Sequence, residues 1–218
     1  MAPKIAIVFY SMYGHIRTLA EAEKRGIEKA GGTCDLYQVA ETLPAEVLTK
    51  MHAPGQKSDI PILTDPATLE QYDGFLMGIP TRFGNFPAQW KAFWDKTGGQ
   101  WASGGFHGKF AGVFISTASP AAARSPRRLP WGAGSFAAGD GSRQPSAKEL
   151  EVAEIQGEQF YKVVNNGPAA SDENKKTATT ADNTTASGNQ TASDANEPKE
   201  KKSKGEGPCG LPKKCVVQ

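Results

Sequence analysis

The chain has 218 residues and a formal net charge of +2, with 25 basic against 23 acidic side chains. This balance argues against a dedicated nucleic-acid-binding protein, whose surface would be strongly basic. The sequence carries no signal-peptide pattern and no long apolar span, and its three cysteines are an odd number. We therefore expect a reducing, cytosolic compartment.

The composition divides the chain into two parts. Residues 167–209 include no Val, Ile, Leu, Phe, Met, Trp or Tyr. Such a segment buries too little apolar surface to offset the entropy lost on ordering. We therefore predict one folded domain over residues 2–166, large enough for a single core, followed by a disordered hydrophilic tail over residues 167–218.

The beginning of the chain has the pattern of a strand, a tight loop and a helix. Residues 5–10 are all apolar or aromatic, as in a parallel strand that is buried on both faces. From Ile16 to Ala30 apolar residues recur at helical spacing, and Gly31-Gly32 supplies a stop. The loop of residues 11–15 should therefore present backbone N–H groups and the positive end of a helix dipole to an anion.

The side chains of this loop indicate which anion it could hold. Neither G-x-G-x-x-G nor G-x-x-x-x-G-K-[ST] follows the first strand, but hydroxyl groups occur at Ser11, Tyr13 and Thr18. Hydroxyl and N–H donors together suit a terminal phosphomonoester. A loop that merely turns the chain and caps the helix remains the alternative.

The following elements alternate between strand and helix. Residues 33–39 are predicted as a second strand, 45–51 as a short helix, and Asp65-Pro66 as the start of another helix that ends at Tyr72. Residues 74–79 form an apolar, hence central, third strand, and residues 88–97 a helix that buries Trp90, Phe93 and Trp94. Residues 110–117 are the fourth strand. Ser146 to Glu149 fits a capping box that opens a final helix.

A second loop of suitable chemistry follows the third strand. The loop after strand one and the loop after strand three flank the crevice of an open α/β sheet, where ligands bind. Pro80 stiffens the second loop, and Thr81, Arg82 and Asn85 offer donors. Gly84 lets the backbone approach a flat ring and Phe83 can shield it. The alternative is an ordinary surface turn with an exposed arginine.

Four motifs resemble the WrbA family of flavodoxin-like NAD(P)H:quinone oxidoreductases. The motifs are residues 11–16 (SMYGHI), 78–85 (GIPTRFGN), 101–104 (WASG) and 130–145, which contain PWGAG and GDGSRQP. The residues of these motifs are most similar to those of fungal members of the family, some of which are described as minor allergens. The resemblance covers nearly all of residues 2–166. It implies a doubly wound parallel sheet with strand order 2-1-3-4-5.

The resemblance also implies the cofactor and the residues that hold it. FMN would be bound, and NADH or NADPH would reduce it before two electrons pass together to a quinone. The implied FMN-binding residues are Ser11, Met12, Tyr13, Gly14, His15, Ile16, Pro80, Thr81, Arg82, Phe83, Gly84, Asn85, Ser116 and Thr117. Phe83 and Trp101 would form an apolar wall against which nicotinamide and quinone stack. Arg82 would stabilise the negative charge of the reduced flavin.

The segment that follows the fourth strand departs from the family pattern. The family continues with a glycine-rich FMN loop, a helix, a His-Gly segment and a fifth strand, whereas residues 118–129 are a short stretch rich in Ala, Arg and Pro. We therefore expect the fifth strand and the active-site histidine to be missing, since His107 lies on the other side of strand four. The consequences would be an exposed edge on strand four, weaker FMN binding and doubtful tetramer contacts. A wrong exon or reading frame over residues 118–130 is one hypothesis.

The final four residues, Cys215-Val216-Val217-Gln218, match a C-a-a-X box whose glutamine predicts farnesylation. Lysines at 213 and 214 lie beside it, and Cys209 could carry a palmitoyl group as the second anchor that stable binding needs. A chance ending is the alternative. The prediction places the domain at the cytoplasmic face of a membrane.

The sequence leads to one main functional hypothesis and two rivals. The main hypothesis is a membrane-tethered, FMN-dependent NAD(P)H:quinone oxidoreductase. The first rival is a catalytically impaired domain that serves as a tethered scaffold, and the second is a one-electron carrier of the flavodoxin type. We find no serine-hydrolase elbow and no pattern of metal ligands.

Overall fold

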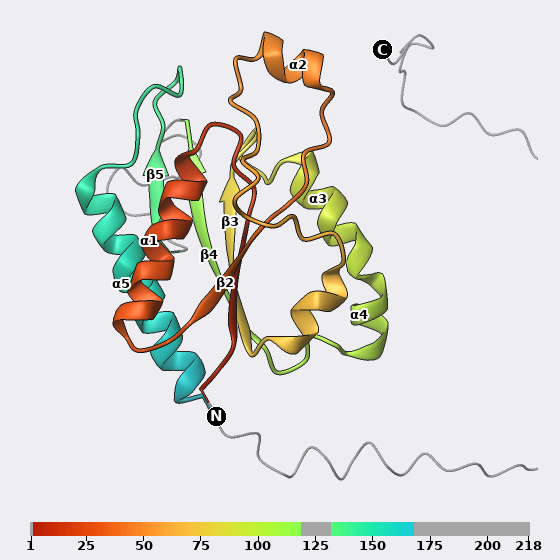
Figure 1. Cartoon of the computed structure of the whole chain (residues 1–218), viewed down its shortest axis with the longest axis vertical. Helices are drawn as coiled ribbons and strands as arrows, with labels where there is room; N and C mark the ends of the chain where they lie inside the picture. The colour runs from red at the N-terminus through yellow and green to blue at the C-terminus, as the bar shows by residue number, and fades with distance from the viewer. Residues whose placement is uncertain (1, 119–131, 168–218) are drawn as a thin grey trace, which may run out of the picture. The chain divides into compact units, whose positions relative to one another are not determined.

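The computed structural model describes residues 2–118 and 132–167, which form a parallel sheet covered by helices on both faces (Figure 1). The strand order is β2-β1-β3-β4-β5. The strands are β1 (Ile5–Phe9), β2 (Cys34–Gln38), β3 (Gly74–Pro80), β4 (Phe110–Thr117) and β5 (Gly134–Phe136). The helices are α1 (His15–Lys29), α2 (Ala45–Lys50), α3 (Ala88–Trp94), α4 (Gly98–Ser103) and α5 (Ala147–Asn165), with 3-10 turns η1 (Pro66–Gln71) and η2 (Asp95–Thr97). The predicted α/β class and the order 2-1-3-4-5 are confirmed.

The central strand β1 divides the core into two halves. Ile5, Ile7 and Phe9 pack into one apolar cluster, whereas the alternating residues Ala6 and Val8 pack into a second cluster on the opposite face. All five residues of the strand are buried. This alternation follows from the two-residue period of a strand and explains why the whole run is apolar.

One face of the sheet is covered by the pair α1 and α5, which lie side by side (Figure 1). Glycines bring the two helices close together. A Cβ atom at Gly26 would lie 1.9 Å from the carbonyl oxygen of Glu154, and one at Gly157 would lie 2.1 Å from the carbonyl oxygen of Glu23. The predicted capping box of α5 is present, because Ser146 and Glu149 bond each other's backbone N–H groups.

The other face is covered by η1, α3 and α4 (Figure 1). The predicted packing of α3 is confirmed, since Trp90 and Phe93 are buried. The indole Nε1–H of Trp90 donates to the carbonyl oxygen of Gly78 at 2.9 Å. This bond fixes α3 beneath the end of β3, immediately before the loop of residues 81–87.

The prediction that the fifth strand is missing is wrong. Residues 134–136 form a short β5 that pairs in parallel with residues 115–117 of β4. The strand escaped prediction because three residues, one of them glycine, give no periodicity, and pairing with β4 defines them instead. Among the described residues, β5 pairs with the last three residues of β4, and before them the carbonyl oxygen of Val113 accepts a hydrogen bond from Gln156.

Several predictions concern residues outside the described ranges. One is the prediction that residues 118–130 replace a structured element; of these residues only 118 is described. Another is the disordered tail, of which residues 168–218, with both cysteines, are not described. Within the described residues, no helix is both long enough and apolar enough to span a bilayer.

Candidate functional site

The carboxyl ends of β1, β3 and β4 surround a cavity of about 540 Å³. This volume lies in the usual range for small-molecule sites, and the place is the one where open parallel sheets bind ligands. The lining residues are Ser11, Met12, Tyr13, His15, Ile16, Met51, His52, Pro80, Thr81, Arg82, Ser116, Thr117, Ala118, Ala137, Gly139, Asp140 and Gly141.

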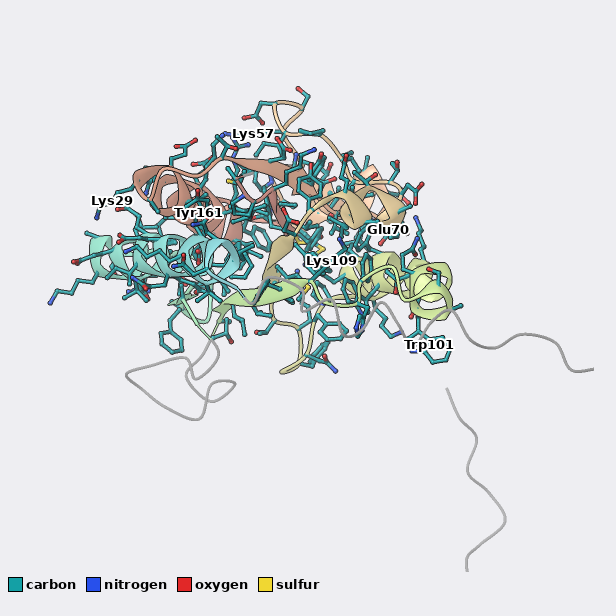
Figure 2. All side chains as sticks on the ribbon, turned by 90° about the horizontal axis from the view of Figure 1, so that it is seen from below. Lys29, Lys57, Glu70, Trp101, Lys109 and Tyr161 are labelled. Atoms are coloured by element: carbon teal, nitrogen blue, oxygen red, sulfur yellow. The ribbon has the colours of Figure 1, made fainter. Side chains whose placement is uncertain are left out.

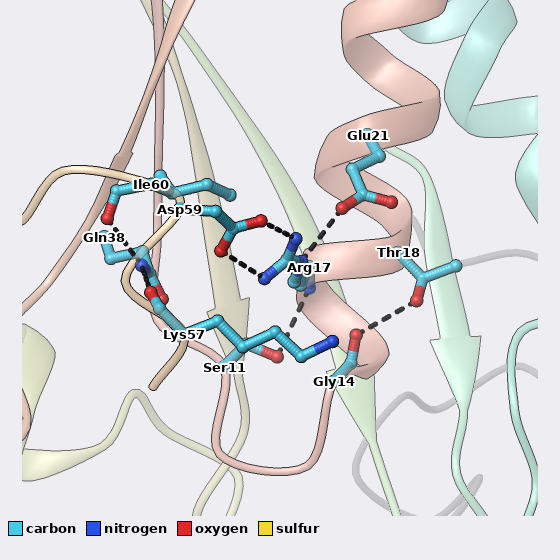
Figure 3. A network of polar contacts seen from close by, with 9 residues as sticks. All are labelled: Ser11, Gly14, Arg17, Thr18, Glu21, Gln38, Lys57, Asp59 and Ile60. Atoms are coloured by element: carbon cyan, nitrogen blue, oxygen red, sulfur yellow. Dashed lines mark hydrogen bonds and ion pairs between the residues drawn. The ribbon is translucent and has the colours of Figure 1, made fainter. Parts of the chain in front are cut away.

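The loop between β1 and α1 supplies the first wall of the cavity. Gly14 is the N-cap of α1, and its φ of 93° is a conformation that residues with a side chain rarely adopt. Ser11 Oγ accepts from the backbone N–H of Arg17 at 3.3 Å, and Thr18 Oγ1 donates to the carbonyl oxygen of Gly14 at 3.1 Å (Figure 3). The backbone N–H groups of His15 and Ile16, at the start of α1, have no partner within the helix.

The positive charge of Arg17 is paired with acidic side chains of the protein itself. Its guanidinium donates to both carboxylate oxygens of Asp59, at 2.9 and 2.5 Å, and to Glu21 at 2.9 Å (Figure 3). The hydrogen bond from Arg17 lowers the pKa of Asp59. The loop therefore offers neutral hydroxyl and N–H donors to a ligand, and the ion pair fastens the segment around Asp59 to α1.

The segment between α2 and η1 is held against the same loop. The hydroxyl of Tyr13 donates to the carbonyl oxygen of Met51 at 3.2 Å. Gln38 Nε2 donates to the carbonyl oxygens of Lys57 and Ile60, both at 2.8 Å (Figure 3). The bond from Tyr13 holds Met51, and with it His52, at the mouth of the cavity.

The loop after β3 supplies the opposite wall. The backbone N–H of Thr81 donates to the carbonyl oxygen of Ser116 at 2.8 Å, which joins this loop to β4. Arg82 and Asn85 exchange two backbone hydrogen bonds, of 2.7 and 2.9 Å. Phe83 and Gly84 between them have φ values of 52° and 78°, as in a tight two-residue turn.

The turn directs its side chains in different directions. One guanidinium nitrogen of Arg82 lies 3.1 Å from the sulfur of Met12, so the two cavity walls meet at this pair. Phe83, at the tip of the turn, is fully exposed to solvent.

The structure brings most of the predicted site residues together. Ten of them line the cavity: Ser11, Met12, Tyr13, His15, Ile16, Pro80, Thr81, Arg82, Ser116 and Thr117. Four more, Gly14, Phe83, Gly84 and Asn85, belong to the same loops without lining it. Trp101 is 86% exposed on α4, at the outer edge of the molecule (Figure 2). The roles of these residues stay predictions. Cys209 and Cys215 lie outside the described residues.

A family model for flavodoxin matches residues 7–157. The chain belongs to the flavodoxin family. The resemblance stated from the four sequence motifs is thereby confirmed at the level of a flavodoxin-like family.

Several curated relatives of this flavodoxin-family chain come from fungi. Minor allergen Alt a 7 of Alternaria alternata is 51% identical over 199 residues, which cover 75% of this chain and 98% of the relative. The NAD(P)H quinone oxidoreductase PST1 of Candida albicans is 49% identical over 194 residues, covering 74% and 97%. A solved WrbA-like protein from Agrobacterium tumefaciens is 22% identical, with a TM-score of 0.47, covering 74% and 97%.

The flavodoxin-family site contains residues that sequence reasoning missed. Asp140 and Gly141 line the cavity from the loop after β5, and Met51 and His52 line it from the loop after α2. Asp140 accepts hydrogen bonds from the backbone and hydroxyl of Ser142, which lower the pKa of its carboxyl. The turn-forming sequence Gly-Asp-Gly could have marked this loop. His52 left no such signal, although its φ of 53° is unusual for a residue with a side chain.

The histidine of the first loop is anchored from the same side. His15 is buried, and its Nε2 lies 3.0 Å from the carbonyl oxygen of Arg143. Arg143 itself forms an ion pair with Glu149 at the start of α5, at 3.0 Å. The loop after β5 is therefore fixed to α1 and to α5. It closes the third side of the cavity.

Proposed function

We propose that this chain is an FMN-dependent NAD(P)H:quinone oxidoreductase. The observation that carries the proposal is the cavity at the carboxyl ends of β1, β3 and β4. The N-terminus of α1 lines one side of this cavity and the loop after β3 lines the other. Curated relatives with 47–49% identity that bear the name NAD(P)H quinone oxidoreductase support the chemistry.

The donor set of the cavity fits the phosphate of FMN. The loop of residues 11–16 offers the hydroxyl of Ser11 and the N–H groups of the first turn of α1, while Arg17 is already paired. A dianionic phosphomonoester is stabilised by such dipoles without a buried ion pair. A side chain at Gly14 would be strained by the φ of 93°, which explains the glycine at the N-cap.

The loop after β3 and the end of β4 would hold the ring. Pro80 and Thr81 lie against the strand ends, and the buried hydroxyl groups of Ser116 and Thr117 lie on the neighbouring strand. Arg82 places its positive charge beside Met12 in the cavity. When bound, FMN would supply the hydride and electron transfer, whereas Arg82 would orient the ring and stabilise negative charge on it.

The apolar wall is part of the same proposal. Phe83 and Trp101 each expose a large aromatic surface that a nicotinamide or quinone ring could stack on. Their exposure in the isolated chain is consistent with a surface that is covered only when a planar ligand or another subunit is present.

The specific test compares two arginine variants of the full chain. We expect Arg82→Ala to lower benzoquinone-dependent NAD(P)H oxidation by about 10²-fold, because a preorganised charge at the reacting ring is lost. Arg25→Ala is the matched control, since Arg25 is an exposed cation of α1 that pairs with Glu154. A folded preparation that retains no flavin after incubation with excess FMN and removal of the unbound FMN would contradict the proposal.

A catalytically impaired scaffold is the second candidate, and one observation favours it. The alignment with the Alternaria protein runs over 199 residues but covers 75% of this chain. Since 75% of 218 residues is about 164, about 35 positions of the relative have no counterpart here. This supports a shortened region after β4. Sequencing the transcript over residues 118–130 tests whether the shortening is real, and visible flavin absorbance separates an enzyme from a scaffold.

Membrane tethering is proposed from the tail alone. The order Cys215-Val216-Val217-Gln218 and the lysines before it support prenylation of Cys215, with Cys209 as a second acylation site. Metabolic labelling with a farnesyl analogue should mark the wild-type chain and not Cys215→Ser. An unlabelled wild type would refute the tether without touching the oxidoreductase proposal.

A further inference from the structure

Glu41, in the loop that follows β2, carries a carboxylate that accepts four hydrogen bonds beside the cavity walls. Its Oε1 accepts from the backbone N–H groups of Thr42 and Leu43, at 2.8 and 3.0 Å, and from Gln89 Nε2 at 2.8 Å. Its Oε2 accepts from the hydroxyl of Tyr10 at 2.6 Å. Four donors thus converge on one side chain.

The donors come from three segments that each lead into the candidate site. Tyr10 immediately precedes the phosphate loop, which begins at Ser11. Gln89 lies in the first turn of α3, directly after the loop that carries Arg82. Thr42 and Leu43 lie at the start of the segment of residues 42–52, which reaches the cavity at Met51. Glu41 itself does not line the cavity.

The protonation states favour these bonds at neutral pH. Burial raises the pKa of Glu41, but the hydrogen bonds from Tyr10, Leu43, Gln89 and Thr42 outweigh it, and the pKa lies below its usual value. Burial, and next the bond to Glu41, raise the pKa of Tyr10 far above that of an ordinary phenol. The pair is therefore a carboxylate and a neutral hydroxyl, joined by a charge-assisted hydrogen bond.

We propose that Glu41 is a positioning residue of the cofactor site. It fixes the phosphate loop, the loop after β3 and the segment of residues 42–52 relative to one another. This inference rests on the proposed FMN site and deepens it. Glu41 acts through Tyr10 and Gln89, not by contact with the ligand. Because the walls of the cavity come from separate segments, a shared carboxylate preorganises all of them before FMN arrives.

The chain offers a matched control for a purely structural role. The hydroxyl of Tyr72 donates to Asp35 Oδ2 at 2.7 Å, so it also forms a tyrosine-carboxylate bond. Tyr10 and Tyr72 are both buried in the same apolar cluster. Tyr72, however, lies two residues before β3, at the amino ends of the strands and away from the cavity.

The experiment measures FMN dissociation constants by quenching of flavin fluorescence, with thermal unfolding of each FMN-free protein beside it. The full chain is compared with Tyr10→Phe, Glu41→Gln, their double variant and Tyr72→Phe. We expect the two single variants at the site to weaken FMN binding about tenfold, as for a lost hydrogen bond to a charged group. The double variant should be no weaker than either single one, since both remove the same link.

Tyr72→Phe should lower the melting temperature about as much as Tyr10→Phe and change FMN affinity by less than about twofold. The proposal is overturned if Tyr10→Phe and Glu41→Gln bind FMN as the wild type does, or if Tyr72→Phe weakens binding equally. Tyr10→Phe keeps the buried ring, so it decides the question even if Glu41→Gln fails to fold. A folded wild type that binds no FMN would overturn the proposed function as well, which is a different result from a loss confined to the variants.

Discussion

Glu23 occupies an unusual environment for a single acidic residue. It lies on the face of α1 that packs against the core, its side chain is completely buried, and neither carboxylate oxygen has a hydrogen-bond partner among the described residues. Burial raises the pKa of its carboxyl to about 9. The group is therefore neutral in the folded domain at pH 7, although it would be ionised in the unfolded chain.

This difference predicts how stability depends on pH. Because the folded-state pKa is raised from 4.5 to about 9, the favourable contribution of the protonated group is complete below about pH 4.5 and is lost as pH rises toward 9. Glu23→Gln removes the titration. We expect it to raise the free energy of unfolding at pH 7 by about 3 kcal/mol.

Urea unfolding at pH 5, 7 and 8.5 would measure this effect. The wild type should lose stability relative to Glu23→Gln as pH rises. Glu28→Gln is the control, since Glu28 is a half-exposed residue of the same helix that pairs with Lys24. Parallel pH profiles for the wild type and Glu23→Gln would show that the buried carboxyl is charged or hydrated in the folded domain.

At the level of elements, the contact between α1 and α5 depends on two glycines. Gly157→Ala would place a Cβ atom 2.1 Å from the carbonyl oxygen of Glu23, so the helices would have to separate. The better helix propensity of alanine offsets only part of this strain. We expect a net loss of about 1–3 kcal/mol in chemical denaturation.

Gly99→Ala serves as the comparison for that variant. Gly99 is in α4 and a Cβ atom there would meet nothing within 4 Å. It should gain up to about 1 kcal/mol from helix propensity alone. If both alanine variants were equally stabilising, close backbone approach would not be what selects glycine in α5.

The sequence predicted those elements whose information is local. The apolar runs that became β1, β3 and β4 carry their own signal, as does the capping box at Ser146. The strand at residues 134–136 carries none, because only its pairing with residues 115–117 makes it a strand. The same distinction between local and long-range information divides the site residues into those that could be predicted and those that could not. Ser11 and Thr81 follow strands and could be predicted, whereas Met51 and Asp140 reach the cavity through long-range packing.

At the scale of the whole molecule, ligand binding and stability are linked. If the cavity holds FMN only in the folded domain, FMN at about 100 times its dissociation constant adds about 2.7 kcal/mol to the free energy of unfolding. For a domain of this size we expect a rise of about 5–10 °C in melting temperature.

Differential scanning calorimetry with FMN and with riboflavin would test this linkage and its cause. Riboflavin lacks the phosphate that the loop of residues 11–16 is proposed to bind, so it should raise the melting temperature much less at the same concentration. Equal shifts for the two compounds would mean that the loop contributes nothing to recognition.

The pairing of α1 with α5 also constrains how the polypeptide is made. The glycine face of α1 has its partner more than a hundred residues later in the sequence, so a growing polypeptide on the ribosome carries this face uncovered until residues 147–165 have emerged. During that interval Glu23 and Gly26, which pack against Gly157 and Glu154 in the finished domain, lack their partners on α5. The first helix to be synthesised is thus among the last to be enclosed.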